Sequence, residues 1–319
     1  MELTIITVTQ IAQMFIIMII GLISTKLKVI TKEGNIQLSN VLIYIVTPIL
    51  IVSSYQQEFS KEKLAGLGIA FFLAVITHVL GIFIAKICIS RKSQNFVVER
   101  MSIIYTNCGF IGLPLLYALF GSDGVFYCTA YITAFHIFLW SHGIMLMNAG
   151  NEVKKTTFLK KFITIITHPN IIAIIIGLLF YVIRIRLPKI IIEPFYAINA
   201  LNSPLAMLVA GSTLAGTSII KILKTKRIYW VTVCSLILVP FFSLLIFKAI
   251  MYAVAPFYLL DSTIVISILI GTACPAGAMT TMLALSYNKD SEYASSIFSI
   301  TTLLCIVTIP LLVFVFGLV

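Results

Sequence analysis

Long apolar runs alternate with short polar segments along the whole chain. Each run has roughly the 20 residues that an α-helix needs to cross the hydrocarbon core of a bilayer. The runs are too long and too uniformly apolar for barrel strands, so the pattern predicts an all-α polytopic membrane protein. The ten expected spans cover residues 4–25, 36–56, 64–90, 101–121, 123–148, 169–186, 194–218, 228–252, 261–286 and 293–317.

Composition supports this class, because 60% of the 319 residues are hydrophobic and only 10% are charged. The net charge of +11 is unevenly placed: 16 of the 22 Lys and Arg residues fall in the loops after the odd-numbered spans. The positive-inside rule then puts these loops in the cytoplasm and both termini outside the plasma membrane. The basic charge predicts topology and contact with anionic lipid, and nucleic acid is not expected as a partner.

Sequence signatures of catalysis and of metal binding are missing. The six cysteines lie within spans or at their ends with no CxxC spacing, and are predicted to be buried apolar residues. No nucleophile–base pair, metal-ligand spacing or phosphate-binding loop is visible. We therefore expect neither an enzyme nor a cofactor or metal.

Ten spans divide into two groups of five, and an odd number in each half predicts inverted topology. The expected first repeat covers residues 1–150, the second covers 169–319, and a cytoplasmic connector covers 151–168. Prolines support the division, because two of them recur at corresponding places in each half. Pro48 and Pro204 are expected to be hinges in spans two and seven, and Pro114 and Pro275 lie in spans four and nine.

Spans four and nine are expected to be broken helices. A proline inside a helix removes a hydrogen bond and clashes with the preceding turn, and glycines flank both Pro114 and Pro275. A break at membrane depth leaves free N–H groups and the positive end of a helix dipole, which together attract an anion. The alternative is that both prolines only kink ordinary packed helices. If the breaks meet, the substrate-binding residues are Cys108, Gly109, Gly112 and Pro114 on one side and Cys274, Pro275, Ala276, Gly277 and Thr280 on the other.

Polar side chains inside the spans are few. Asn107 can donate and accept hydrogen bonds and is predicted either to contact a ligand or to cap the half-helix. His136 is a candidate substrate contact, with an interhelical hydrogen bond as the alternative, and His168 is expected to be structural. The eleven acidic residues all fall in loops or at span ends, which disfavours a proton relay through a buried carboxylate.

Four motifs carry a family resemblance: NCGFIGLPLL, HPNIIAIIIGLL, SPLAMLVAGSTLA and CPAGAMTTMLALSYNKDSEYASSIFSITTLLCIVTIPLL. In this order they resemble the auxin efflux carrier family, in the bacterial branch often described as malate or malonate permeases. The resemblance implies ten helices in two inverted repeats, similar to bile-acid carriers and sodium/proton antiporters. It also implies that helices four and nine cross at Pro114 and Pro275, and that Asn107 contacts a carboxylate. The plant carriers have Gln-Gly where this chain has Ala276-Gly277, so contacts there are left open.

The resemblance further implies a scaffold of helices one, two, six and seven that forms a homodimer, and a moving core of helices three to five and eight to ten. We therefore expect a secondary transporter for efflux of a small organic carboxylate anion by elevator-like alternating access. It would be facilitative or driven by the membrane potential. The alternatives are a sodium- or proton-coupled symporter and, in another class, a ligand-binding sensor or channel.

Overall fold

The computed structural model describes residues 2–149, 158–216, 225–255 and 260–318, and every regular element in this part of the chain is helical. The predicted all-α membrane class is confirmed. The elements, with η marking π-helical turns, are α1 (Glu2–Lys26), α2 (Lys32–Val41), η1 (Leu42–Val46), α3 (Thr47–Ser54), α4 (Lys61–Cys88), α5 (Phe96–Ile104), η2 (Cys108–Gly112), α6 (Leu113–Phe138), η3 (Leu139–Gly143), α7 (Ile144–Met147), α8 (Phe158–Ile166), α9 (Pro169–Ile183), α10 (Lys189–Asn199), α11 (Asn202–Ala215), α13 (Lys226–Val233), η4 (Cys234–Leu238), α14 (Val239–Val254), α15 (Ser262–Ala273), α16 (Ala278–Ser286) and α17 (Ser291–Leu318).

Seven helical stretches among the described residues are long and apolar enough to cross a membrane, and α9 and α15 are shorter apolar helices. The stretch Cys108–Met147, with 40 residues, runs over two of the expected spans. It bends at Gly121, whose φ of 59° and ψ of −140° suit glycine because a Cβ would be strained there. The ten-helix inverted repeat remains a prediction. Residues 151–157 of the expected connector lie outside the described residues, and α8 occupies most of the rest.

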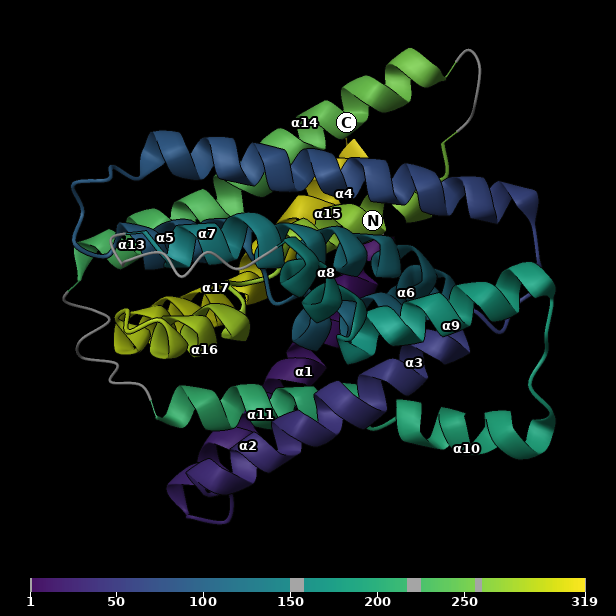
Figure 1. Ribbon diagram of the computed structural model, residues 1–319, viewed down its shortest axis with the longest axis horizontal. Helices are drawn as coiled ribbons and strands as arrows, with labels where there is room; N and C mark the ends of the chain where they lie inside the picture. Colours follow the sequence, from purple (N-terminus) through teal and green to yellow (C-terminus); the bar gives the residue numbers. More distant parts are fainter. Residues whose placement is uncertain (1, 150–157, 217–224, 256–259, 319) are drawn as a thin grey trace.

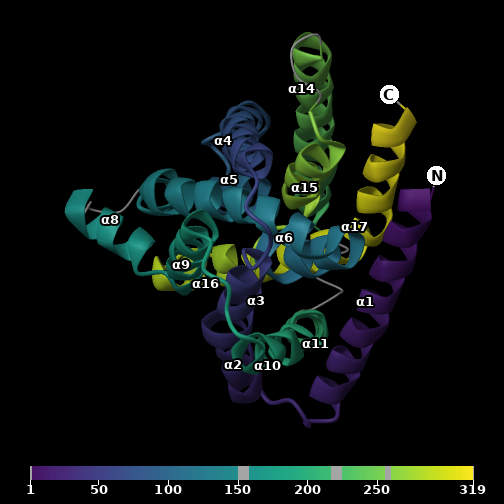
Figure 2. The same ribbon diagram turned by 90° about the vertical axis from the view of Figure 1, so that its right-hand side faces the viewer.

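The helices form two outer groups and a central group, and each outer group combines helices from both halves of the chain. In both views α2, α3, α10 and α11 lie along one side, and α4, α14 and α15 lie along the other (Figures 1 and 2). Helices α6, α16 and α17 lie between them, and the two ends of the chain are close together. Two of the largest fully buried side chains, Tyr131 and Phe126, belong to α6.

Three prolines sit just after π-helical turns rather than at breaks. Pro48, Pro114 and Pro240 follow η1, η2 and η4, and the residue before each proline donates its N–H to the carbonyl five positions back. The wider turn makes room for the proline ring and takes up the disrupted hydrogen-bond pattern. The prediction that span four breaks at Pro114 is therefore wrong. Pro48 likewise lies within the continuous helical stretch Lys32–Ser54.

Helices α1 and α11 approach closely because a glycine on each helix faces the backbone of the other. A Cβ built at Gly211 would lie 1.9 Å from the carbonyl oxygen of Met18, and one at Gly21 would lie 2.5 Å from that of Leu208. Small residues permit this backbone contact, which is a common way for helices to associate within a membrane.

Gly211→Ala is expected to lower the free energy of unfolding by about 1–3 kcal/mol or more, because the added methyl group must push α1 and α11 apart. Gly68→Ala is the matched control, since a Cβ at that position meets nothing within 4 Å. Thermal unfolding of the purified variants in detergent measures the difference. Equal unfolding temperatures for the two variants would contradict the close approach.

Glu99 is a second correction, because it is completely buried (0% exposed) near the start of α5. Glu99 does lie near a helix end, as expected for every acidic residue, but its burial was not expected. It accepts hydrogen bonds from Arg227 Nε, from the Tyr293 hydroxyl at 3.1 Å and from the Ser93 hydroxyl at 3.1 Å. These hydrogen bonds connect α5 to α13 and α17, so the Glu99 carboxylate has a structural role.

Replacing Arg227 is expected to cost more stability than replacing its partner. Arg227→Met leaves the buried carboxylate of Glu99 with neutral donors only, at a cost of about 3 kcal/mol. Glu99→Gln leaves an arginine whose side chain is 44% exposed and can be solvated, so the loss should be less than half as large. Chemical or thermal unfolding of both variants tests this asymmetry, and the reverse order would show that the pair is not what stabilises this corner.

Candidate functional site

The chain leaves the helical conformation at Tyr105–Asn107, between α5 and η2, and at Cys274–Gly277, between α15 and α16. These two extended segments cross and pair. The Asn107 N–H donates to the Pro275 carbonyl at 2.7 Å, and the Gly277 N–H donates to the Tyr105 carbonyl at 2.8 Å. Thr106 and Ala276 thereby form a short antiparallel bridge. Two interrupted helices therefore do meet, but the first interruption comes at residues 105–107 and not at Pro114.

Groups from α6, α15 and α17 hold the crossing in place. The Thr106 hydroxyl donates to the Gly271 carbonyl of α15 at 2.7 Å and lies 3.1 Å from the Tyr131 hydroxyl of α6. The Ala276 N–H donates to the Thr301 hydroxyl of α17 at 3.1 Å. The sequence did not single out Thr106 or Thr301, because nothing local distinguishes them from other threonines in apolar helices.

The amides expected to bind an anion are displaced by a few residues. Those of Asn107, Ala276 and Gly277 are already used at the crossing. The first helical hydrogen bonds beyond it are Ile111 N–H to Asn107 and Thr280 N–H to Gly277. The amides between, on Cys108–Phe110 and on Ala278–Met279, precede those bonds and therefore make no helical backbone hydrogen bond. The available donors thus belong to the first turns of η2 and α16.

A cavity of about 90 Å³ adjoins both first turns. This volume holds several water molecules or a small guest. None of the described residues that line it is Asp, Glu, Lys or Arg. Among the described residues, no three His, Cys, Asp or Glu side chains gather closely enough to hold a metal ion. The lining residues are Ile43, Thr106, Asn107, Cys108, Gly109, Phe110, Ile132, Phe135, His136, His168, Asn170, Gly277, Ala278, Met279 and Met282.

Asn107 belongs to the first extended segment of the crossing, and it is 6% exposed. It occupies the N-cap position of η2 but makes no capping hydrogen bond. Its Nδ2 atom is buried and finds no hydrogen-bond partner among the described residues. The capping alternative is therefore not what this geometry shows. An amide donor left unsatisfied costs about 1–3 kcal/mol, which a guest able to accept a hydrogen bond would recover.

Two histidines also line the cavity. The rings of His136 and His168 lie 3.9 Å apart, and His136 Nδ1 is buried without a partner among the described residues. His168 caps α9 by accepting from the Asn170 N–H at 3.3 Å, so its expected structural role is confirmed. Burial lowers the pKa of His168 to about 4, and this imidazole is neutral at physiological pH. The sequence did not place it in the cavity.

Comparison with known proteins agrees with the motifs. The profile of a family described as membrane transport proteins, which corresponds to the auxin efflux carriers, matches residues 6–313. The chain belongs to this family. A relative, an uncharacterized transporter of Methanocaldococcus jannaschii, is 24% identical over 300 residues, which covers 90% of this chain and 92% of the relative. Membership makes a transporter the function class and accounts for the long apolar helices.

In this transporter the predicted site residues divide into two groups. Asn107, Cys108, Gly109, His136 and Gly277 line the cavity. The others surround the crossing without lining it: Gly112 packs against the Cys274 sulfur, Pro275 and Ala276 supply backbone groups, Thr280 is buried in α16, and Pro114 lies in the first turn of α6. The cavity also includes Asn170, whose buried Oδ1 finds no partner among the described residues. The HPN motif that contains it was the available signal.

Proposed function

We propose that this transporter carries a small organic carboxylate anion out of the cell by alternating access. The observation behind the proposal is the Asn107 Nδ2 donor, buried and unpartnered in a cavity where two helix N-termini converge. A carboxylate could accept from this amide and from first-turn N–H groups without requiring a buried lysine or arginine. The lack of acidic residues in the lining removes a source of repulsion.

Electrostatics set the strength and the direction of transport in this proposal. The N-termini of η2 and α16 contribute about 1–2 kcal/mol to anion binding in a partly buried site. Because this is modest, Asn107 must supply much of the selectivity. A membrane potential that is negative inside favours exit of each negative charge by about 2.3 kcal/mol per 100 mV.

The location of the cavity suits an elevator-like movement. Ile43 belongs to expected span two, and His168 and Asn170 lie at the start of expected span six, both within the proposed scaffold. Asn107, Gly277 and the other lining residues belong to the proposed transport core. A guest in this cavity would therefore lie at the interface where the core slides against the scaffold. The proposed homodimer would leave the scaffold fixed while each core moves.

Counterflow in proteoliposomes tests the function. Vesicles that contain purified protein and are preloaded with an unlabelled carboxylate should accumulate the labelled compound, and vesicles without the preload should not. A panel including malate, malonate and an indole acid, with and without a sodium or proton gradient, identifies the substrate and any coupling ion. Absence of counterflow for every carboxylate, with protein that is still folded, would overturn the proposal. Flux without saturation or trans-stimulation would indicate a channel.

A further inference from the structure

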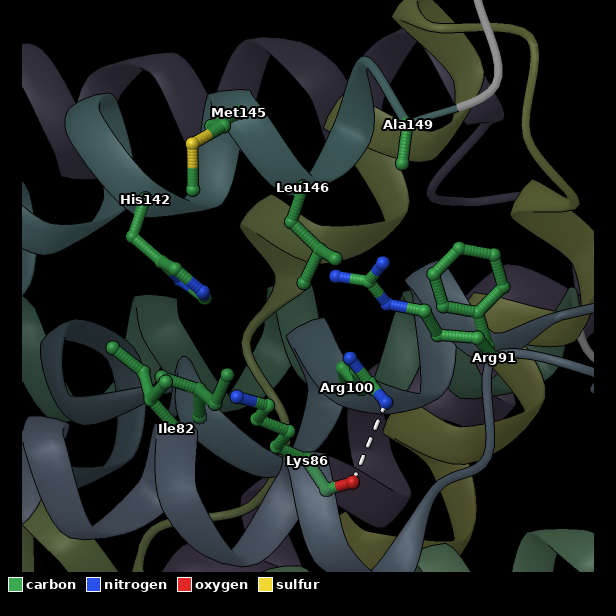
Figure 3. A pocket seen from close by; sticks show the side chains of 10 residues that line it. Ile82, Lys86, Arg91, Arg100, His142, Met145, Leu146 and Ala149 are labelled. Atoms are coloured by element: carbon green, nitrogen blue, oxygen red, sulfur yellow. Dashed lines mark hydrogen bonds between the residues drawn. The ribbon is translucent and has the colours of Figure 1, made fainter.

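A second and larger cavity, of about 680 Å³, lies between α4, α5 and the η3–α7 segment. Figure 3 shows the side chains of Lys86, Arg91, Arg100 and His142 turned toward one shared space. The cavity lies at the end of α4 that carries the basic loop and that is expected to face the cytoplasm. It is separate from the crossing, since none of its lining residues also lines the smaller cavity.

Among the residues that the structure describes, no acidic side chain neutralises the positive charges in this cavity. Its lining includes no Asp or Glu, and no ion pair of Lys86, Arg91 or Arg100 is found among the described residues. Arg100 is only 8% exposed, and its Nε and Nη2 atoms donate to the carbonyls of Ile89 and Lys86. Its neighbour Glu99 is turned away, toward Arg227. A buried guanidinium without a counter-charge is costly unless an anion joins it.

The same cavity has an apolar wall. Ile82, Ile104, Met145 and Leu146 line it, and Met145 is largely exposed. Phe83, which follows the lining residue Ile82 on α4, is also exposed, and such an apolar surface suits acyl chains. Cationic and apolar side chains therefore line the same cavity.

We propose that this cavity binds an anionic phospholipid. The phosphate would contact Lys86, Arg91 and Arg100, and an acyl chain would lie along Ile82 and Met145. Basic pockets between helices on the cytoplasmic side of a membrane suit such headgroups. A free phosphate shares the headgroup chemistry but gains nothing from the apolar wall. The inference does not depend on the transported substrate.

The site is connected to the crossing by one side chain. The Tyr105 hydroxyl lies 3.0 Å from His142 Nδ1 and donates to the Phe138 carbonyl at 2.9 Å, and the Tyr105 carbonyl accepts from Gly277. A lipid headgroup beside His142 is thus next to a residue that helps to form the crossing.

Binding can be measured on the full chain, delipidated in detergent, by native mass spectrometry and thermal unfolding. The additives are phosphatidylglycerol, phosphatidylcholine and inorganic phosphate. We expect phosphatidylglycerol to bind more tightly than the other two additives and to be the one that raises the unfolding temperature. In Lys86→Gln/Arg91→Gln the preference for phosphatidylglycerol over phosphatidylcholine should fall about 30-fold, because each removed charge weakens lipid attraction several-fold. Lys26→Gln/Lys92→Gln is the matched control, since it removes two exposed charges outside the cavity.

Two results would overturn the inference: an unchanged lipid preference in the Lys86/Arg91 variant, or an equal loss in the Lys26/Lys92 control. Stabilisation by inorganic phosphate as large as that by phosphatidylglycerol would reject the lipid in favour of a soluble anion. Lys86 and Arg91 are both exposed, so we expect the variant to fold, and its unfolding temperature without lipid verifies this. None of these measurements uses transport, so their failure is distinguishable from failure of the proposed function.

Discussion

Asn107→Ala should reduce carboxylate counterflow about 10- to 100-fold while leaving the protein folded. A hydrogen bond to a charged group contributes about 1.5–3 kcal/mol, which corresponds to this range of affinity. The Asn107 Nδ2 donor has no partner among the described residues, so removing this amide breaks no internal hydrogen bond. Initial counterflow rates and the unfolding temperature, measured on the same preparation, separate the two effects.

Two companion variants sharpen this prediction. Asn107→Asp should be more damaging than alanine, because it adds a negative charge to a cavity lined by no Lys or Arg. Asn148→Ala is the matched control, since its amide bonds the Ile144 carbonyl at 2.8 Å and does not line the cavity. Normal counterflow in Asn107→Ala would remove this residue from substrate recognition and with it the main support for the proposed site.

Gly277→Ala should open the crossing and lower both stability and transport. The new Cβ would lie 3.0 Å from the Tyr105 carbonyl oxygen and 3.2 Å from that of Thr106. These atoms belong to backbone that is held by its own hydrogen bonds, so the overlap is not relieved by a side-chain rotation. We expect a loss of about 1–3 kcal/mol in the free energy of unfolding, and more for Gly277→Val.

Gly109→Ala is the control for this steric argument, because a Cβ at position 109 meets nothing within 4 Å. It should unfold at nearly the same temperature as the original protein, although it narrows the cavity. If the Gly277 and Gly109 variants prove equally stable, the close contact between the two extended segments is not what holds the crossing together.

The partial success with the broken helices has a physical explanation. Pro275 does lie in an interruption, whereas Pro114 sits one turn inside a helix that absorbs it through a π-helical turn. A proline only removes one hydrogen bond, and a widened turn and a break both accommodate that loss. The first interruption is instead supported by partners at least 165 residues away, such as Pro275 for Asn107 and Gly271 for Thr106. No local pattern around Tyr105–Asn107 predicts this pairing.

The amino-acid sequence by itself determined the all-α membrane class and singled out Asn107 as the polar side chain to test. These depend on the length and polarity of local segments, which the hydrocarbon thickness and the cost of a buried amide constrain directly. Only the tertiary structure decided that Thr106 pairs with Ala276, that His168 and Asn170 line one cavity with Asn107, and that Glu99 is buried against Arg227. Each of these depends on which side of a helix meets which distant neighbour, and an apolar helix looks much the same on every side until its neighbours are in place.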